Sequence, residues 1–95
     1  MPQASARHIL VKTEKEAQDL RRQITEEGKA FTDLAKAKSM CPSGRSGGSL
    51  GTFSKGDMVP EFDAVVFGTL AVGEVSAPVK TQFGYHLIQV ERRMA

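Results

Sequence analysis

Three side chains in this sequence carry chemistry that a globular core does not require: His8, Cys41 and His86. A cysteine with a histidine is typical of a thiol nucleophile, and both residue types also bind metal ions. A metal site would need a closer Cys/His spacing and a further ligand, and the sequence names no oxyanion-stabilising partner for a cysteine protease. From the residues alone, Cys41 can be a nucleophile, a group that adjusts the electrostatics of a site, or an inert buried thiol. Both histidines remain open as structural residues of strands.

The other candidates for a binding site are apolar. Met58 and Phe62 fall one helical turn apart, a spacing that by itself is typical of core packing. The glycines at 47 and 48 lack the Gly-Lys-Ser/Thr pattern that cradles phosphate, which argues against a nucleotide-binding loop.

Length and composition bound the class of protein. A chain of 95 residues with 40% apolar and 25% charged residues fits one globular domain, which we expect to span 1–95. The lone cysteine fits a reducing compartment, and the apolar run 9–11 is too short for a signal peptide or a membrane span. A net charge of +2 gives no reason to expect nucleic-acid binding. We therefore expect a soluble cytoplasmic monomer without membrane or nucleic-acid partners.

The elements that must position these residues follow from periodicity, caps and breakers. In chain order they are a strand at 6–12, a helix from a Thr-x-x-Glu capping box at 13–16 to Gly28, a helix from Ala30, a glycine-rich loop at 39–56 with a short strand at 50–53, a helix from Pro60 to Gly68, an edge strand at 75–79 and a final strand at 85–90. This order predicts an α+β domain with a mostly antiparallel sheet.

Four stretches, taken in their order and spacing, resemble the parvulin family of peptidyl-prolyl cis/trans isomerases. They read ARHILVK at 6–12, SMCPSG at 39–44, GGSLGTF at 47–53 running on to MVPEF at 58–62, and TQFGYH at 81–86. The resemblance covers nearly the whole chain and is strongest to the small, free-standing bacterial members. It implies an α+β fold in which a four-stranded, mostly antiparallel sheet is surrounded by helices, as in parvulins and FKBP-like proteins.

The resemblance also assigns the site residue by residue. It implies a catalytic set of His8, Cys41 and His86, and a substrate-binding set made of Leu50, Met58 and Phe62 in the proline pocket, Phe53 behind them, Thr81 at the rim, and Phe83. Rotation about a C–N bond breaks no σ bond, so the implied activity needs no metal and no cofactor. The implied partners are proline-containing peptides and unfolded protein chains.

Two departures from the phosphate-directed members of that family bear on specificity. Phe83 stands where those members carry a small hydroxyl residue, and the segment 13–16 begins a helix where they carry a basic loop with paired arginines. We therefore expect activity on unphosphorylated Xaa-Pro bonds. The alternative is a module that binds proline motifs or unfolded chains with negligible turnover, because equal binding of ground and transition states gives affinity without rate.

The two histidines are expected to meet. Each lies on a strand that we place near the centre of the sheet, His8 on the first and His86 on the last. A buried neutral pair is satisfied when one ring donates to the other, with Thr81 or Tyr85 as possible further partners. On this interpretation the pair mainly fixes the floor of the site.

Overall fold

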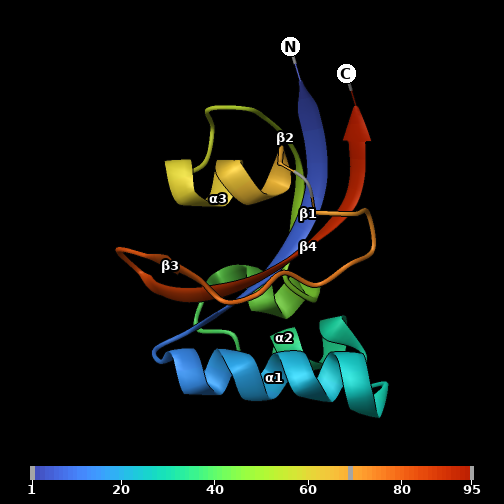
Figure 1. The fold of residues 1–95 in the computed structure, drawn as a ribbon, viewed down its shortest axis with the longest axis vertical. Coiled ribbons are helices and arrows are strands. Elements are labelled where there is room, and N and C mark those ends of the chain that lie inside the picture. The colour runs from blue at the N-terminus through green and yellow to red at the C-terminus, as the bar shows by residue number, and fades with distance from the viewer. Residues whose placement is uncertain (1, 69, 95) are drawn as a thin grey trace.

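The computed structural model describes residues 2–68 and 70–94 (Figure 1). Its elements are β1 (Gln3–Val11), α1 (Glu14–Glu27), α2 (Phe31–Lys38), the 3-10 helix η1 (Pro42–Ser46), β2 (Ser49–Ser54), α3 (Pro60–Val66), β3 (Val79–Thr81) and β4 (Gly84–Met94). The strands form one sheet in the order β2-β1-β4-β3, and all three pairings are antiparallel. The predicted α+β class and the antiparallel sheet are confirmed.

The first and last strands form the centre of the sheet. Their pairing runs from Gln3 opposite Met94 to Val11 opposite Tyr85, with one irregularity beside Ser5. Figure 1 shows both ends of the chain side by side at one end of this pair. Because β2 and β3 are the edge strands, His8 and His86 lie on the two central strands, as predicted.

The helices α1 and α2 cover one side of these strands. The Thr13 hydroxyl accepts a hydrogen bond from the Glu16 amide at 3.2 Å, which caps the start of α1. Gly28 ends the helix in the left-handed conformation, with φ of 71°. Apolar residues of both helices then pack with the odd-numbered residues of the central strands in a cluster of Ile9, Val11, Ala17, Leu20, Phe31, Ala35, Val75 and Leu87.

The helix α3 covers the other side. Pro60 occupies its first turn, where the missing N–H costs nothing. Phe62 and Val66 are buried against Phe53 of β2 and even-numbered residues of the central strands, in a second cluster of Ala4, Ala6, Phe53, Phe62, Val66, Ile88 and Val90. None of the helices within 2–68 and 70–94 has the length and apolar character needed to cross a membrane.

Two sequence predictions differ from the structure. The edge strand predicted at 75–79 is displaced: Val75 forms only an isolated bridge with Gln89, and β3 begins at Val79. Pro78 explains the interruption, because proline has no N–H to donate to the ladder. The segment predicted as loop with a strand at 50–53 also holds η1, and its strand runs over Ser49–Ser54.

Candidate active site

A groove of about 410 Å³ opens on the α3 side of the central strands. Seven of its lining residues belong to the predicted site: His8, Cys41, Leu50, Met58, Phe62, Phe83 and His86. Four others were missed from the sequence: Leu10, Met40, Pro42 and Val59. Among the described lining residues there is no lysine, arginine, aspartate or glutamate. The groove can therefore hold an apolar group but offers no cation to a phosphate.

Phe53 and Thr81 belong to the predicted site but lie outside the lining. Phe53 is 6% exposed, and its ring meets that of Phe62 at an angle of 63° with centroids 6.1 Å apart. It thus supports the groove wall from behind, as the resemblance implied. Thr81 is only 8% exposed and sits behind His86, and not at the rim.

The two histidine rings meet at the base of the groove. His8 Nδ1 lies 2.9 Å from His86 Nδ1, and the ring planes are inclined by 15°. The outer nitrogens also have partners: His86 Nε2 lies 2.8 Å from Thr81 Oγ1, and His8 Nε2 lies 3.0 Å from Ser43 Oγ. Phe62 closes one side, with its ring edge-on to both imidazoles at centroid distances of 5.8 Å and 5.9 Å.

Burial keeps both imidazoles neutral at pH 7. Each histidine is 5% exposed. Burial, and secondarily the proximity of His86, lowers the pKa of His8 from 6.5 to about 4. Burial likewise lowers the pKa of His86 below its ordinary value. The base of the groove is therefore uncharged under physiological conditions.

Cys41 is held over the groove by the end of β1. The Met40 amide donates to the Leu10 carbonyl at 2.8 Å, and the Ser39 hydroxyl accepts from the Leu10 amide at 3.1 Å. The thiol is half-buried. All four nitrogens of the two imidazoles already have partners within 3.0 Å, so none is available to take a proton from Cys41. This arrangement disfavours a cysteine–histidine nucleophile pair.

A glycine allows the segment that carries Ser43 to approach β1. The His8 amide donates to the Gly48 carbonyl at 3.0 Å. Gly48 has a φ of 86°, and a Cβ placed there would collide with the His8 carbonyl oxygen. Only glycine fits this close approach, which sets the Ser43 hydroxyl beside the His8 ring.

Two exposed apolar side chains flank the mouth of the groove. Phe83 is 57% exposed and Met40 is 50% exposed. Phe83 lies in the turn between β3 and β4, where its amide donates to Thr81 Oγ1 at 3.1 Å. Apolar surface of this kind beside a groove is typical of a binding site.

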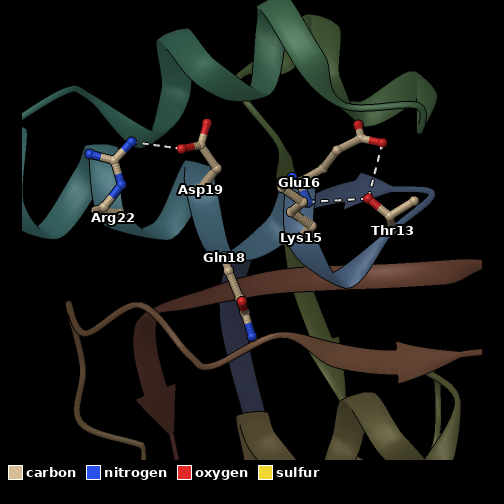
Figure 2. Close-up of a pocket in the computed structure, with 6 residues that line it drawn as sticks. All are labelled: Thr13, Lys15, Glu16, Gln18, Asp19 and Arg22. Atoms are coloured by element: carbon tan, nitrogen blue, oxygen red, sulfur yellow. Dashed lines mark hydrogen bonds and ion pairs between the residues drawn. The ribbon is translucent and has the colours of Figure 1, made fainter.

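A second hollow, of about 480 Å³, lies along α1 and has a different character (Figure 2). Its side chains are polar or charged, and two pairs of them bond: Arg22 pairs with Asp19 at 2.7 Å, and the Thr13 hydroxyl donates to Glu16. Figure 2 shows Gln18 pointing away from these pairs. With both partners of the ion pair about half exposed, this surface resembles an ordinary solvated helix face. Within the described part of the chain, no three His, Cys, Asp or Glu side chains are placed to hold a metal ion.

Comparison with known proteins gives a family match over almost the whole chain. Residues 3–92 match the model of the rotamase family described as the PPIC-type PPIASE domain. The chain is 47% identical over 92 residues to the foldase protein PrsA of Exiguobacterium sibiricum. This match covers 96% of this chain and 30% of that protein. The chain thus spans about a third of this curated relative.

Solved structures agree with this match. The crystal structure of the peptidylprolyl isomerase PrsA from Bacillus anthracis superimposes with a TM-score of 0.93 at 37% identity, over 99% of this chain and 43% of that one. The solution structure of NmPin, the parvuline of Nitrosopumilus maritimus, superimposes with a TM-score of 0.82 at 40% identity, over 95% of this chain and 96% of that one. Similar folds therefore occur both within longer chains and as a chain of similar size.

Proposed function

Because this chain belongs to the PPIC-type, parvulin-like family of peptidyl-prolyl isomerases, we propose that it catalyses cis/trans isomerisation of unphosphorylated Xaa-Pro bonds in the groove described above. The observation that carries the proposal is the combination of an apolar groove with a base of two neutral, hydrogen-bonded histidines.

The chemistry of rotation explains why an apolar groove would accelerate it. Amide resonance gives the bond a barrier of about 18–20 kcal/mol, and the planar amide is more dipolar than the twisted transition state. An apolar groove that clamps the prolyl ring disfavours the dipolar planar form relative to the twisted one. Only this differential stabilisation raises the rate, and about 1.4 kcal/mol of it gives a tenfold gain. Several modest contacts from Met58, Leu50 and Phe62 suffice for such a gain.

The neutral histidine pair supports the same effect. A charged imidazolium at the base of the groove would stabilise the carbonyl dipole of the planar amide. Burial lowers the pKa of His8 to about 4, so this charge is absent at pH 7. The pair offers a rigid and uncharged floor, which accords with a mainly structural role for His8 and His86.

The preference for unphosphorylated substrate rests on charge. β1 ends at Val11 and α1 begins at Glu14, so the connection has no room for a basic loop. The described groove lining also contains no lysine or arginine, and Phe83 presents an aromatic ring at its mouth. A phosphate would be desolvated there without a partner.

A role in assisting protein folding is the corresponding physiological proposal. The similarity to a foldase supports proline-containing segments of unfolded chains as partners. The monomeric state and the cytoplasmic location expected from the sequence stay predictions; sedimentation and cell fractionation test them.

Exchange spectroscopy on short Xaa-Pro peptides tests the activity directly. We expect added protein to increase cis/trans exchange cross-peaks of unphosphorylated peptides without metal or cofactor, and to favour an apolar or uncharged Xaa. Val72→Ala is a matched control, because Val72 is an exposed apolar residue outside the groove lining. Peptide binding without faster exchange would indicate the alternative binding module, and exchange confined to phospho-Ser-Pro peptides would contradict the proposed specificity.

A further inference from the structure

One wall of the groove is carried by the connection between β2 and α3. Residues 55–57 of this connection are exposed, and Met58 and Val59, which follow them, line the groove. The backbone of Met58 makes no hydrogen bond to another backbone group within the described part of the chain. The position of this wall therefore depends on the residues that flank Met58.

Packing alone does not fix the Met58 side chain. It packs partly against the α3-side cluster and lines the groove. It also lines another hollow, of about 530 Å³, whose lining includes Gly56 and Asp63. Met58 thus has open space on two sides, and its backbone has to be held if the wall is to stay in place.

Asp63 of α3 clamps the chain on both sides of Met58. Its carboxylate Oδ2 accepts from the Gly56 amide at 2.7 Å, and its own amide donates to the Val59 carbonyl at 3.0 Å. The segment 56–59 is thereby closed onto a single residue. The second bond belongs to the first turn of the helix and forms with any ordinary side chain at 63, whereas the first bond requires the carboxylate. A hydrogen bond to a charged acceptor is also the stronger kind.

The other bonds of the connection do not replace this clamp. Asp57 Oδ2 accepts from the Ser54 amide at 2.9 Å, and the Asp57 amide donates to the Ser54 carbonyl at 3.1 Å. The Lys55 amide donates to the Pro2 carbonyl at 3.1 Å. These bonds fix the end of β2, but none of them reaches α3. Among the residues that the structure describes, the Asp63 carboxylate is the one side-chain hydrogen bond between the connection and the helix.

We infer that Asp63 is a positioning residue of the isomerase site, because its carboxylate holds Met58 in the wall of the groove through the Gly56 amide. Asp63 is half-buried and does not line the groove, so it acts through Met58 and not on the substrate. A wall that is already in place does not have to be ordered when the prolyl ring enters, and this raises the rate. The effect on catalysis rests on the proposed function, whereas the effect on the position of Met58 does not.

Methyl spectra test the position of Met58 without substrate, and Met40 in the same groove is an internal control. Asp63→Ala should shift and broaden the Met58 methyl resonance but leave that of Met40 unchanged, because Met40 is held by the Leu10 carbonyl and not by α3. Asp63→Asn keeps an oxygen that accepts from Gly56 and should restore the Met58 resonance. An unchanged Met58 resonance in folded Asp63→Ala, or equal shifts of both methyls, would overturn the inference.

Glu61→Ala is the matched control variant. Glu61 is an exposed acidic residue in the first turn of the same helix, so its removal changes the charge at the start of α3 as Asp63→Ala does. Glu61→Ala should leave both the Met58 resonance and kcat/KM unchanged. Changes equal to those of Asp63→Ala would assign the effect to charge and contradict a role for the Gly56 bond.

A double variant tests whether Asp63 acts through Met58. In peptide exchange, Asp63→Ala alone should lower kcat/KM about fivefold, the value of one ordinary hydrogen bond. Once the Met58 side chain is gone, little should remain to be positioned. Adding Asp63→Ala to Met58→Ala should therefore lower kcat/KM by less than about twofold. An undiminished loss in the double variant would place the action of Asp63 elsewhere.

The outcomes separate this inference from the proposed function. If the wild-type protein showed no catalysis, the proposed function would fail, while the methyl spectra would still test the position of Met58. If Asp63→Ala did not fold, hydrogen exchange of the wild-type protein provides the test. The Gly56 amide should be better protected than the Met58 amide, which has no backbone partner among the described residues. Equal protection of the two amides would refute the clamp.

Discussion

On the two sides of the central strands, neighbouring residues of the same strands lie in different environments. Ile9 and Leu87 are buried beneath α1 and α2 in a cluster whose buried members are all apolar. Their neighbours His8 and His86 lie on the α3 side, where buried imidazoles adjoin an open groove. Side chains alternate across a strand, so a step of one residue separates a closed core from a site. The α3 side, the open side, thus combines this site with an apolar cluster of its own, whereas the α1–α2 side, the closed side, is core alone.

The largest effect should come from the closed side. Leu87→Ala removes a fully buried side chain and should lower the free energy of unfolding by about 2–5 kcal/mol. Because Leu87 does not line the groove, the kcat/KM of the folded molecules should stay at the wild-type value. Urea unfolding measures the first quantity, and exchange spectroscopy in a stabilising osmolyte measures the second. A tenfold loss of activity in the folded variant would show that the two sides are not independent.

Acid should destabilise the domain through the two histidines of the open side. The pKa of His8 is about 4 in the folded protein and 6.5 when unperturbed, so the unfolded chain binds the proton first as the pH falls. Above pH 6.5 His8 is neutral in both the folded and the unfolded state, and this contribution to the free energy of unfolding is fully present. Between pH 6.5 and 4 the free energy of unfolding should fall by about 3 kcal/mol. The lowered pKa of His86 acts in the same direction. Unfolding curves measured across this pH range give the loss. His8→Gln should reduce the slope of the free energy of unfolding against pH, and a slope equal to that of the wild type would assign the effect to other groups.

A smaller effect should follow from truncating the groove wall. Met58→Ala should lower kcat/KM at least about tenfold, equivalent to about 1.4 kcal/mol, while the domain stays folded. Met58 is only partly buried against the α3-side cluster, whereas Phe62 is 3% exposed and belongs to both core and groove. Phe62→Ala would therefore mix the two effects. Unaltered peptide exchange in folded Met58→Ala would place Met58 outside the catalytic groove.

The smallest effect is expected at Cys41. Cys41→Ser keeps a small polar group, and no histidine nitrogen depends on the thiol, so kcat/KM should remain within about threefold of the wild-type value. Intact-mass measurement after turnover should find no covalent adduct. Complete loss of activity with a trapped adduct would establish a nucleophile and overturn this account of the open side.

The sequence predicted the parts of this comparison that depend on periodicity and family motifs. The parvulin resemblance, the α+β class and the antiparallel sheet are confirmed. The meeting of His8 with His86 was also predictable, because both lie on strands expected at the centre of the sheet. Caps at Thr13 and Gly28 and the proline at 60 fixed the helix boundaries through local bonding.

What the sequence did not predict depends on loop geometry. The segment 39–48 holds several serines and glycines, and no pattern indicates that the Ser43 hydroxyl reaches His8. Leu10 lies within an apolar run that reads as core, yet it lines the groove because the alternation turns it to the α3 side. Thr81 was placed at the rim by position in a motif, whereas its hydrogen bond to His86 holds it inside.

The pairing of Gln3 with Met94 has a mechanical consequence. Both ends of the domain leave from the same end of one antiparallel ladder (Figure 1). Tension applied between these ends would load the hydrogen bonds of β1 and β4 one after another, from the Met94 end towards Tyr85, and not all at once in shear. Such a geometry yields at low force. If the domain were tethered at both ends within a longer polypeptide, stretching that polypeptide would unzip the two strands that carry His8 and His86 before it broke the helices free.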